Sequence, residues 1–189
     1  IMYMYFVITP PEATVERGWI RGQQRGRYKS VEDFLGHSVE AYQGIPKLIF
    51  KWLAHTSPRY EFSFFDNSVA EGQFPLTSVI GNQKGMQVFD PMVFVNIERY
   101  QKINIYAQSL AQVYPSSKRM AIANNMTFFN QCLKRFPKVC FSVGQDSDPY
   151  LIVRQKTYTL PDPTLFDQQL EDPTLKVLFE QILINRILR

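Results

Sequence analysis

The sequence predicts an α+β fold, with one or more antiparallel sheets packed by helices. Two patterns support this prediction. Residues 60–97 form short strand-like runs between turn residues, which is typical of a meander of three or four strands. The C-terminal part has a helical stripe, two strand-like runs around an acidic turn, and a capped helix, which together predict a helix–hairpin–helix unit.

The length of 189 residues suits one large domain or two small ones. We place a boundary near residue 97. It divides an N-terminal α+β region (1–97), with a basic loop and the meander, from a C-terminal α+β region (98–189). One continuous domain is the alternative.

The chain begins with eight apolar residues (1–8) followed by Pro10 and Pro11, which predicts a buried strand. This run has no basic region before it and no small-residue cleavage site after it, so it is not a signal peptide. It is also far shorter than the roughly 20 residues that span a bilayer. We therefore expect no membrane span.

The first clear helix starts at Ser30, whose hydroxyl can cap it, and ends at Gly44. Ile45-Pro46 predicts an extended step, and residues 47–54 favour a short buried helix. In the meander, Pro75 predicts that the strand over 74–80 lies at an edge of the sheet, and residues 92–97 form the last strand.

Two helical stripes follow, one over residues 100–114 and a second from Ser117, which can cap the helix, to Phe136. The predicted hairpin pairs residues 138–143 with residues 150–158. The sequence Asp-Pro-Thr-Leu then occurs twice, at 162–165 and 172–175. Each copy predicts a helix start, because Asp can cap the helix and Pro is tolerated at its first position.

The basic character of the chain is local. The whole sequence has 21 Lys and Arg against 17 Asp and Glu, a net charge of +4. Residues 17–29 contain five positive charges and no acidic residue. Because three glycines at about 1 kcal/mol each disfavour a helix, we expect an extended or looped segment there. The positive residues are Arg17, Arg21, Arg25, Arg27 and Lys29.

Such a loop can follow a phosphate backbone, with arginines bonding phosphates and glycines permitting close approach. Trp19 and Tyr28 could stack on exposed bases. An acidic protein partner is an equal alternative. A loop that pairs with acidic groups of its own fold is the third.

Aromatic residues are abundant, with 15 Phe, 10 Tyr and 2 Trp, and this favours a protein that binds other proteins. We expect the partner surface on the C-terminal helix and at the edge strand near Pro75. The helix residues on one side are Leu175, Leu178, Phe179, Ile182 and Leu183.

No pattern indicates catalysis. The chain has two histidines, His37 and His55, and two cysteines, Cys132 and Cys140, and their spacing matches no metal site, disulfide framework or nucleophilic dyad. We therefore expect no catalytic residue, no metal and no cofactor. Two cysteines with core roles also favour a reducing compartment, the cytoplasm.

The C-terminal third resembles the type III secretion chaperone family, which are small α+β proteins that hold secreted substrates. The resemblance lies in the order helix, strand, acidic turn, strand and long helix, over the segments 125–136, 138–143, 146–148, 151–154 and 175–188. It implies an adaptor or chaperone-like subunit of a larger, secretion-related assembly. The alternative is an RNA- or DNA-associated subunit that uses residues 17–29.

Overall fold

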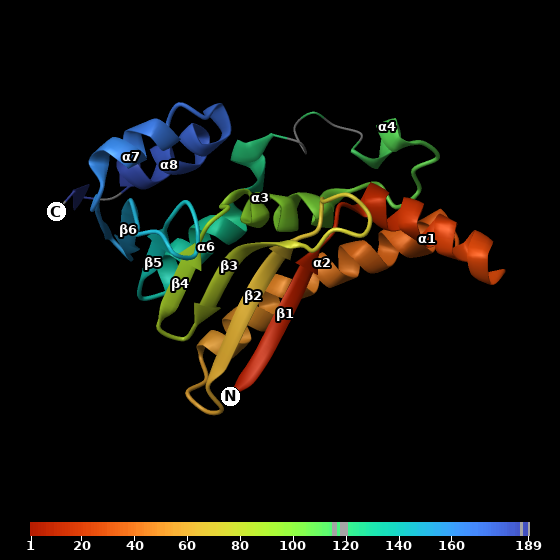
Figure 1. Ribbon diagram of the computed structural model, residues 1–189, viewed down its shortest axis with the longest axis horizontal. Coiled ribbons are helices and arrows are strands. Elements are labelled where there is room, and N and C mark those ends of the chain that lie inside the picture. The colour runs from red at the N-terminus through yellow and green to blue at the C-terminus, as the bar shows by residue number, and fades with distance from the viewer. Residues whose placement is uncertain (115–116, 118–120, 186, 189) are drawn as a thin grey trace.

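The computed structural model describes residues 1–114, 117, 121–185 and 187–188, and it has the α+β fold expected from the sequence. Within these residues eight strands form one sheet in the order β1 to β8 (Figure 1). The strands are β1 (Met2–Ile8), β2 (Tyr60–Asp66), β3 (Leu76–Asn82), β4 (Gly85–Val88), β5 (Val139–Phe141), β6 (Leu151–Arg154), β7 (Thr157–Thr159) and β8 (Ile187–Leu188). The helices are α1 (Pro11–Arg25), α2 (Val31–Leu53), α3 (Met92–Arg99), α4 (Leu110–Val113), α6 (Thr127–Arg135), α7 (Pro163–Gln169) and α8 (Pro173–Asn185), with 3-10 turns η1 (Tyr100–Lys102) and η2 (Ile122–Asn125).

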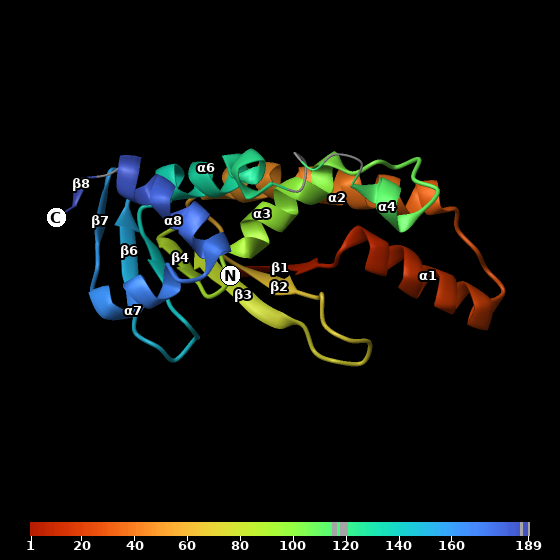
Figure 2. The ribbon, with the colours of Figure 1, turned by 90° about the horizontal axis from the view of Figure 1, so that it is seen from above.

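The sheet is mixed rather than purely antiparallel. Three of its seven pairings are parallel, namely β1 with β2, β4 with β5, and β7 with β8. Each parallel pair is joined through helices, because a parallel connection needs a crossover. Helices α2, α3, α6 and α8 lie over one face of the sheet (Figure 2). None of the described helices covers the opposite face along β1 to β3 (Figure 2).

The core is aromatic and crosses the predicted boundary at residue 97. Phe64 from β2 contacts Phe94 from α3 at 5.8 Å between ring centroids, and Phe94 contacts Phe129 from α6 at 5.5 Å. Phe141 then packs on Phe179 from α8 at 5.4 Å. Both halves of the chain thus share one sheet and one buried cluster, which favours the one-domain alternative.

Helix α2 continues through the break that the sequence predicts at Gly44 and Pro46. The helix over 47–54 is thus its C-terminal part. A proline inside a helix costs about 3 kcal/mol. Burial of Tyr42, Ile45 and Ile49 along one face offsets this cost, because tertiary packing stabilises most protein helices more than propensity does.

The antiparallel meander is confirmed for β2, β3 and β4. The strand predicted over residues 92–97 is wrong, since these residues lie in α3. Val93, Phe94, Val95 and Ile97 are all buried, so the run is apolar on every side and its period does not distinguish helix from strand.

Two further predictions needed correction. The helix expected over 100–114 is reduced to η1 and the four-residue α4. The single strand expected over 150–158 is a hairpin of β6 and β7, which turns at Gln155 with φ of 53°. The two C-terminal helices are confirmed, and the carboxylate of Asp162 caps α7 by accepting a bond from the Leu165 amide at 2.9 Å.

The halves of the sheet meet at Gly85. A side chain at this position would overlap the backbone carbonyl of Lys138, the residue before β5. The Met86 amide donates to the same carbonyl at 3.0 Å. Glycine therefore allows β4 to approach β5 closely, over a pairing of only three residues on each strand.

None of the helices in the described part of the chain is both long enough and apolar enough to cross a bilayer.

Candidate binding surface

The basic segment is helical up to Arg25, so the predicted loop over 17–29 is wrong for most of its length. Two of its glycines explain the helix. A Cβ at Gly18 would overlap the ring of Phe34, and a Cβ at Gly22 would lie 2.8 Å from Tyr28. The glycines thus let α1 pack closely on the first turn of α2 and on the segment that leads into it, and this packing outweighs their low helix propensity.

The structure separates the five positive side chains. Arg17 donates to the carbonyl of Val69 at 2.8 Å and to that of Asn67 at 3.4 Å, so it fastens α1 to the β2–β3 loop. Lys29 lies 3.2 Å from the His37 ring nitrogen and over the Phe34 ring. Both residues have roles within the fold.

Arg21, Arg25 and Arg27 are exposed, and no ion pair or hydrogen bond to them occurs within the described residues. Trp19 and Tyr28 come from the same segment and contact each other, with ring centroids 5.2 Å apart. The two rings are 55% and 61% exposed. Helix α1 extends to the end of the molecule opposite α7 and α8 (Figures 1 and 2).

The apolar side of the C-terminal helix is not a free surface, contrary to expectation. Leu178, Phe179 and Ile182 are fully buried, and Leu175 and Leu183 pack against the same core. Phe179 alone contacts the rings of Phe141, Tyr150 and Phe166. These side chains hold α8 on its own sheet, so they are unavailable to a partner in this fold.

The edge strand predicted near Pro75 is also wrong. Pro75 precedes β3, and β3 lies between β2 and β4. The described strand with a free outer edge in the N-terminal half is β1, seven residues long. Its outward side chains Tyr3, Tyr5 and Val7 are 54%, 66% and 51% exposed.

The backbone of β1 is paired on one side only. The Met2 amide donates to the Arg59 carbonyl, and the Asn67 amide donates to the Ile8 carbonyl, both next to β2. Since successive residues of a strand direct their backbone groups to opposite sides, Tyr3, Tyr5 and Val7 direct theirs to the outer edge. No described residue pairs with these three from that side.

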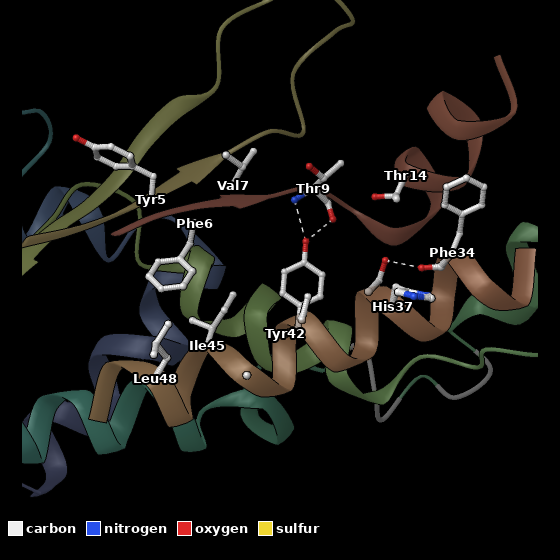
Figure 3. Close-up of a pocket in the computed structure, with 13 residues that line it drawn as sticks. Tyr5, Phe6, Val7, Thr9, Thr14, Phe34, His37, Tyr42, Ile45 and Leu48 are labelled. Carbon is white, nitrogen blue, oxygen red and sulfur yellow. Dashed lines mark hydrogen bonds between the residues drawn. The ribbon is translucent and has the colours of Figure 1, made fainter. Parts of the chain in front are cut away.

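Tyr42 closes this edge at Thr9. Its hydroxyl accepts a bond from the Thr9 amide at 2.9 Å and donates one to the Thr9 carbonyl at 2.6 Å, as dashed lines show in Figure 3. One side chain of α2 thus bonds both groups that a neighbouring strand would bond. Pairing along β1 can therefore extend as far as Val7.

A groove of about 700 Å³ runs between β1 and α2 on this side. Figure 3 shows Phe6, Ile45 and Leu48 along one part of it, and Phe34, His37 and Thr14 beyond Tyr42. The stretch beside Tyr5 and Val7 is thus apolar, with unpaired backbone groups along one wall.

Buried tyrosines support the closed end of the groove. Tyr42 packs on Tyr100 at 5.1 Å, Tyr100 packs on Tyr114, and the Tyr114 hydroxyl donates to Glu12 of α1 at 3.0 Å. Burial raises the pKa of Tyr42 to about 12, partly opposed by its bond to Thr9. Burial, followed by the Glu12 charge, also raises the pKa of Tyr100 and of Tyr114. All three hydroxyls stay protonated at neutral pH.

The histidines and cysteines are not part of the groove's apolar stretch: His37 lines the groove beyond Tyr42, and the other three do not line it. His55 packs on Trp52. Burial raises the pKa of Cys132 and of Cys140, which disfavours the reactive thiolate form of both cysteines. Across the described ranges, no group of three His, Cys, Asp or Glu side chains could hold a metal ion.

Sequence reasoning missed Tyr42, Thr9 and the outer edge of β1. Tyr42 showed only a helical position, and Thr9 only a place before two prolines. The available signal was the composition of residues 1–8, which lack both charge and proline, the two usual protections of an exposed edge.

Comparison with known proteins gives no relative for this chain: no family model, no curated protein and no solved structure matches it.

Proposed function

We propose that this protein is a non-catalytic binding subunit that captures an extended segment of another protein as an additional strand beside β1. The observation that carries the proposal is the set of unpaired backbone groups on Tyr3, Tyr5 and Val7, next to an apolar groove. An adaptor or chaperone-like component of a larger assembly would hold its client in this way.

The physical reason is the cost of an open edge. A long, apolar, uncharged edge strand exposes backbone donors and acceptors that pair readily with another chain. In strand addition these groups supply affinity, and pockets for alternate side chains supply specificity. Here the groove lined by Phe6, Ile45 and Leu48 is the pocket on the helix side.

We expect the captured segment to be apolar at alternate residues and to carry an acidic residue where it passes Tyr5. Leu48 lies below Tyr5 in Figure 3 and is flanked by exposed Lys47 and Lys51. Pairing two copies of this chain around Tyr5 would bring the lysines of both copies toward one axis, and like charges oppose that dimer. We therefore assign the edge to a different polypeptide.

The test uses Val7→Pro. Proline removes the outward amide of Val7, which bonds nothing in the described fold, and edge strands tolerate proline at such positions. Peptides are first selected from a random display library on the wild-type full chain. Their affinity for Val7→Pro should be about tenfold or more below that for the wild type, since the variant lacks one backbone hydrogen bond and its proline ring hinders close approach of the peptide. Val7→Thr keeps the amide and is the matched control, expected within about threefold.

Hydrogen exchange locates the bound segment. Binding should slow exchange at the amides of Tyr3, Tyr5 and Val7, and leave Met4 and Phe6, which already face β2, nearly unchanged. Equal affinity of the selected peptides for Val7→Pro, or protection confined to another surface, would refute strand addition. A wild-type dimer in light scattering that Val7→Pro abolishes would assign the edge to a second copy instead.

A further inference from the structure

The end of α1 and the turn after it present three arginines that the fold does not use. Arg17 is held by the β2–β3 loop and Lys29 lies against His37, whereas Arg21, Arg25 and Arg27 are exposed without a bonding partner among the described residues. Charges on a surface usually find a neighbour of opposite sign or stay dispersed. These three guanidiniums lie within seven residues and have no acidic partner among the described residues, so they are available to an external anion.

Two aromatic rings, those of Trp19 and Tyr28, lie in the same short segment as these charges. The Tyr28 ring folds back over Gly22, where a side chain would displace it, and it contacts the Trp19 ring at 5.2 Å. Despite this packing each ring is more than half exposed. The fold thus fixes the rings in place and still leaves faces open to a planar ligand.

Guanidiniums and open rings together favour one partner chemistry. Planar guanidinium groups bond phosphate oxygens in pairs. Bases of an unpaired strand stack on aromatic side chains regardless of sequence. An acidic protein surface would satisfy the arginines through carboxylates, but these do not supply the row of flat ring faces that stacks on Trp19 and Tyr28. A duplex offers phosphates and the edges of its bases, but it keeps the base faces stacked inside.

We propose that the end of α1 and the turn after it, comprising Trp19, Arg21, Arg25, Arg27 and Tyr28, bind single-stranded nucleic acid through phosphate bonds and base stacking, without sequence preference. The site lies at the tip of α1 and uses neither the outer edge of β1 nor the groove lined by Leu48 (Figure 1). It is therefore independent of strand addition, and either property can fail while the other holds.

The first test is the salt dependence of binding. Fluorescein-labelled oligo-dT and oligo-rU of about twelve nucleotides are titrated with the full chain in rising KCl, and anisotropy is measured. Three arginine–phosphate contacts predict a slope of log K against log salt near −2, or roughly a fifteenfold loss between about 50 and 200 mM. Comparing the two oligonucleotides distinguishes DNA from RNA as the preferred strand.

Arg21→Ala, Arg25→Ala and Arg27→Ala together should abolish this slope and lower the affinity at low salt by more than about tenfold. The matched control removes three exposed positive charges elsewhere, with Lys84→Ala, Lys134→Ala and Lys156→Ala. It should keep the wild-type slope. Equal loss in the control would show general attraction to a cationic protein and would overturn the site.

The second test separates stacking from charge. Trp19→Ala with Tyr28→Ala keeps all arginines, so the salt slope should persist while affinity falls by about fivefold or more. In the wild type, oligo-dT should quench indole emission, and Trp19→Phe should remove that change. Circular dichroism checks that each variant is folded. Unchanged affinity and no quenching, or tighter binding to a poly-glutamate peptide than to oligo-dT, would overturn the proposal.

Discussion

The Tyr42 hydroxyl bonds both the amide and the carbonyl of Thr9, at 2.9 Å and 2.6 Å. Helix α2 is thereby fastened to the end of β1 by one side chain. The contact has two consequences. It stabilises the fold locally, and it ends the unpaired part of the edge at Val7.

Tyr42→Phe should lower the free energy of unfolding by about 1–3 kcal/mol, because it leaves two partly buried backbone groups of Thr9 unbonded. Urea unfolding measures the change, and exchange at the Thr9 amide should accelerate. Tyr3→Phe is the control, since Tyr3 is exposed and should change stability by less than about 0.5 kcal/mol. Equal stability of Tyr42→Phe and the wild type would contradict the role.

Alkaline pH should destabilise the protein through the same cluster. Burial raises the pKa of Tyr42 to about 12, and it raises the pKa of Tyr100 and Tyr114 as well. The unfolded chain ionises first, near pH 10, so this stability is fully present below about pH 10 and is lost as pH rises through about 12. Each tyrosine adds a slope of about 1.4 kcal/mol per pH unit in that window.

Urea unfolding at a series of pH values between about 9 and 11.5 measures this slope. Tyr42→Phe removes one contributing group, so its decline should be shallower than that of the wild type. A flat free energy of unfolding across the series would contradict the cluster.

Glycine-to-alanine variants should have opposite effects in α1 and α2. Gly44→Ala should stabilise by about 0.5–1 kcal/mol, since nothing lies near the added methyl group and alanine favours a helix. Gly22→Ala should destabilise, because its methyl group meets the Tyr28 ring and the Arg27 carbonyl at 3.0 Å. Thermal unfolding compares the pair, and stabilisation by both variants would refute the close packing of α1.

Glu98→Ala should cost about 2–4 kcal/mol. One carboxylate oxygen of this buried residue accepts a bond from the Phe128 amide at 3.0 Å, and the other contacts Lys102 at 3.1 Å. Glu98 thus caps α6 from outside, a helix that lacks a cap bond from its own first residue. Glu180→Ala, which breaks an exposed pair with Lys176, is the control and should change stability by less than about 0.5 kcal/mol.

Local signals predicted the elements whose determinants lie within a few residues. Asp162 caps α7 through an amide three positions away, and the meander follows from turns between adjacent strands. Helix α1 was missed because its glycines contact residues outside the helix, which propensity does not include. The expectation that proline ends a helix also failed at Pro46, where burial of one face of α2 keeps the helix continuous.

The candidate surfaces depended even more on distant contacts. The pairing of β1 with β2 joins residues nearly sixty positions apart, and only this pairing reveals which side of β1 remains open. Likewise, α8 has the predicted apolar side, but an apolar side in the sequence does not distinguish burial against the same chain from burial against a partner. The positive residues at 17–29 were identified, and the structure divides them into fold-bound and available ones.

The pairing of β4 with β5 beside Gly85 also limits how early the whole sheet can form during synthesis. Strands β1 to β4 are complete by Val88, whereas β5 begins at Val139, so about fifty residues must be synthesised before β4 gains its neighbour. A sheet of β1 to β4 formed before that point would have two open edges, at β1 and at β4. Pairing with β5 beside Gly85 closes the second, and no described strand closes the first.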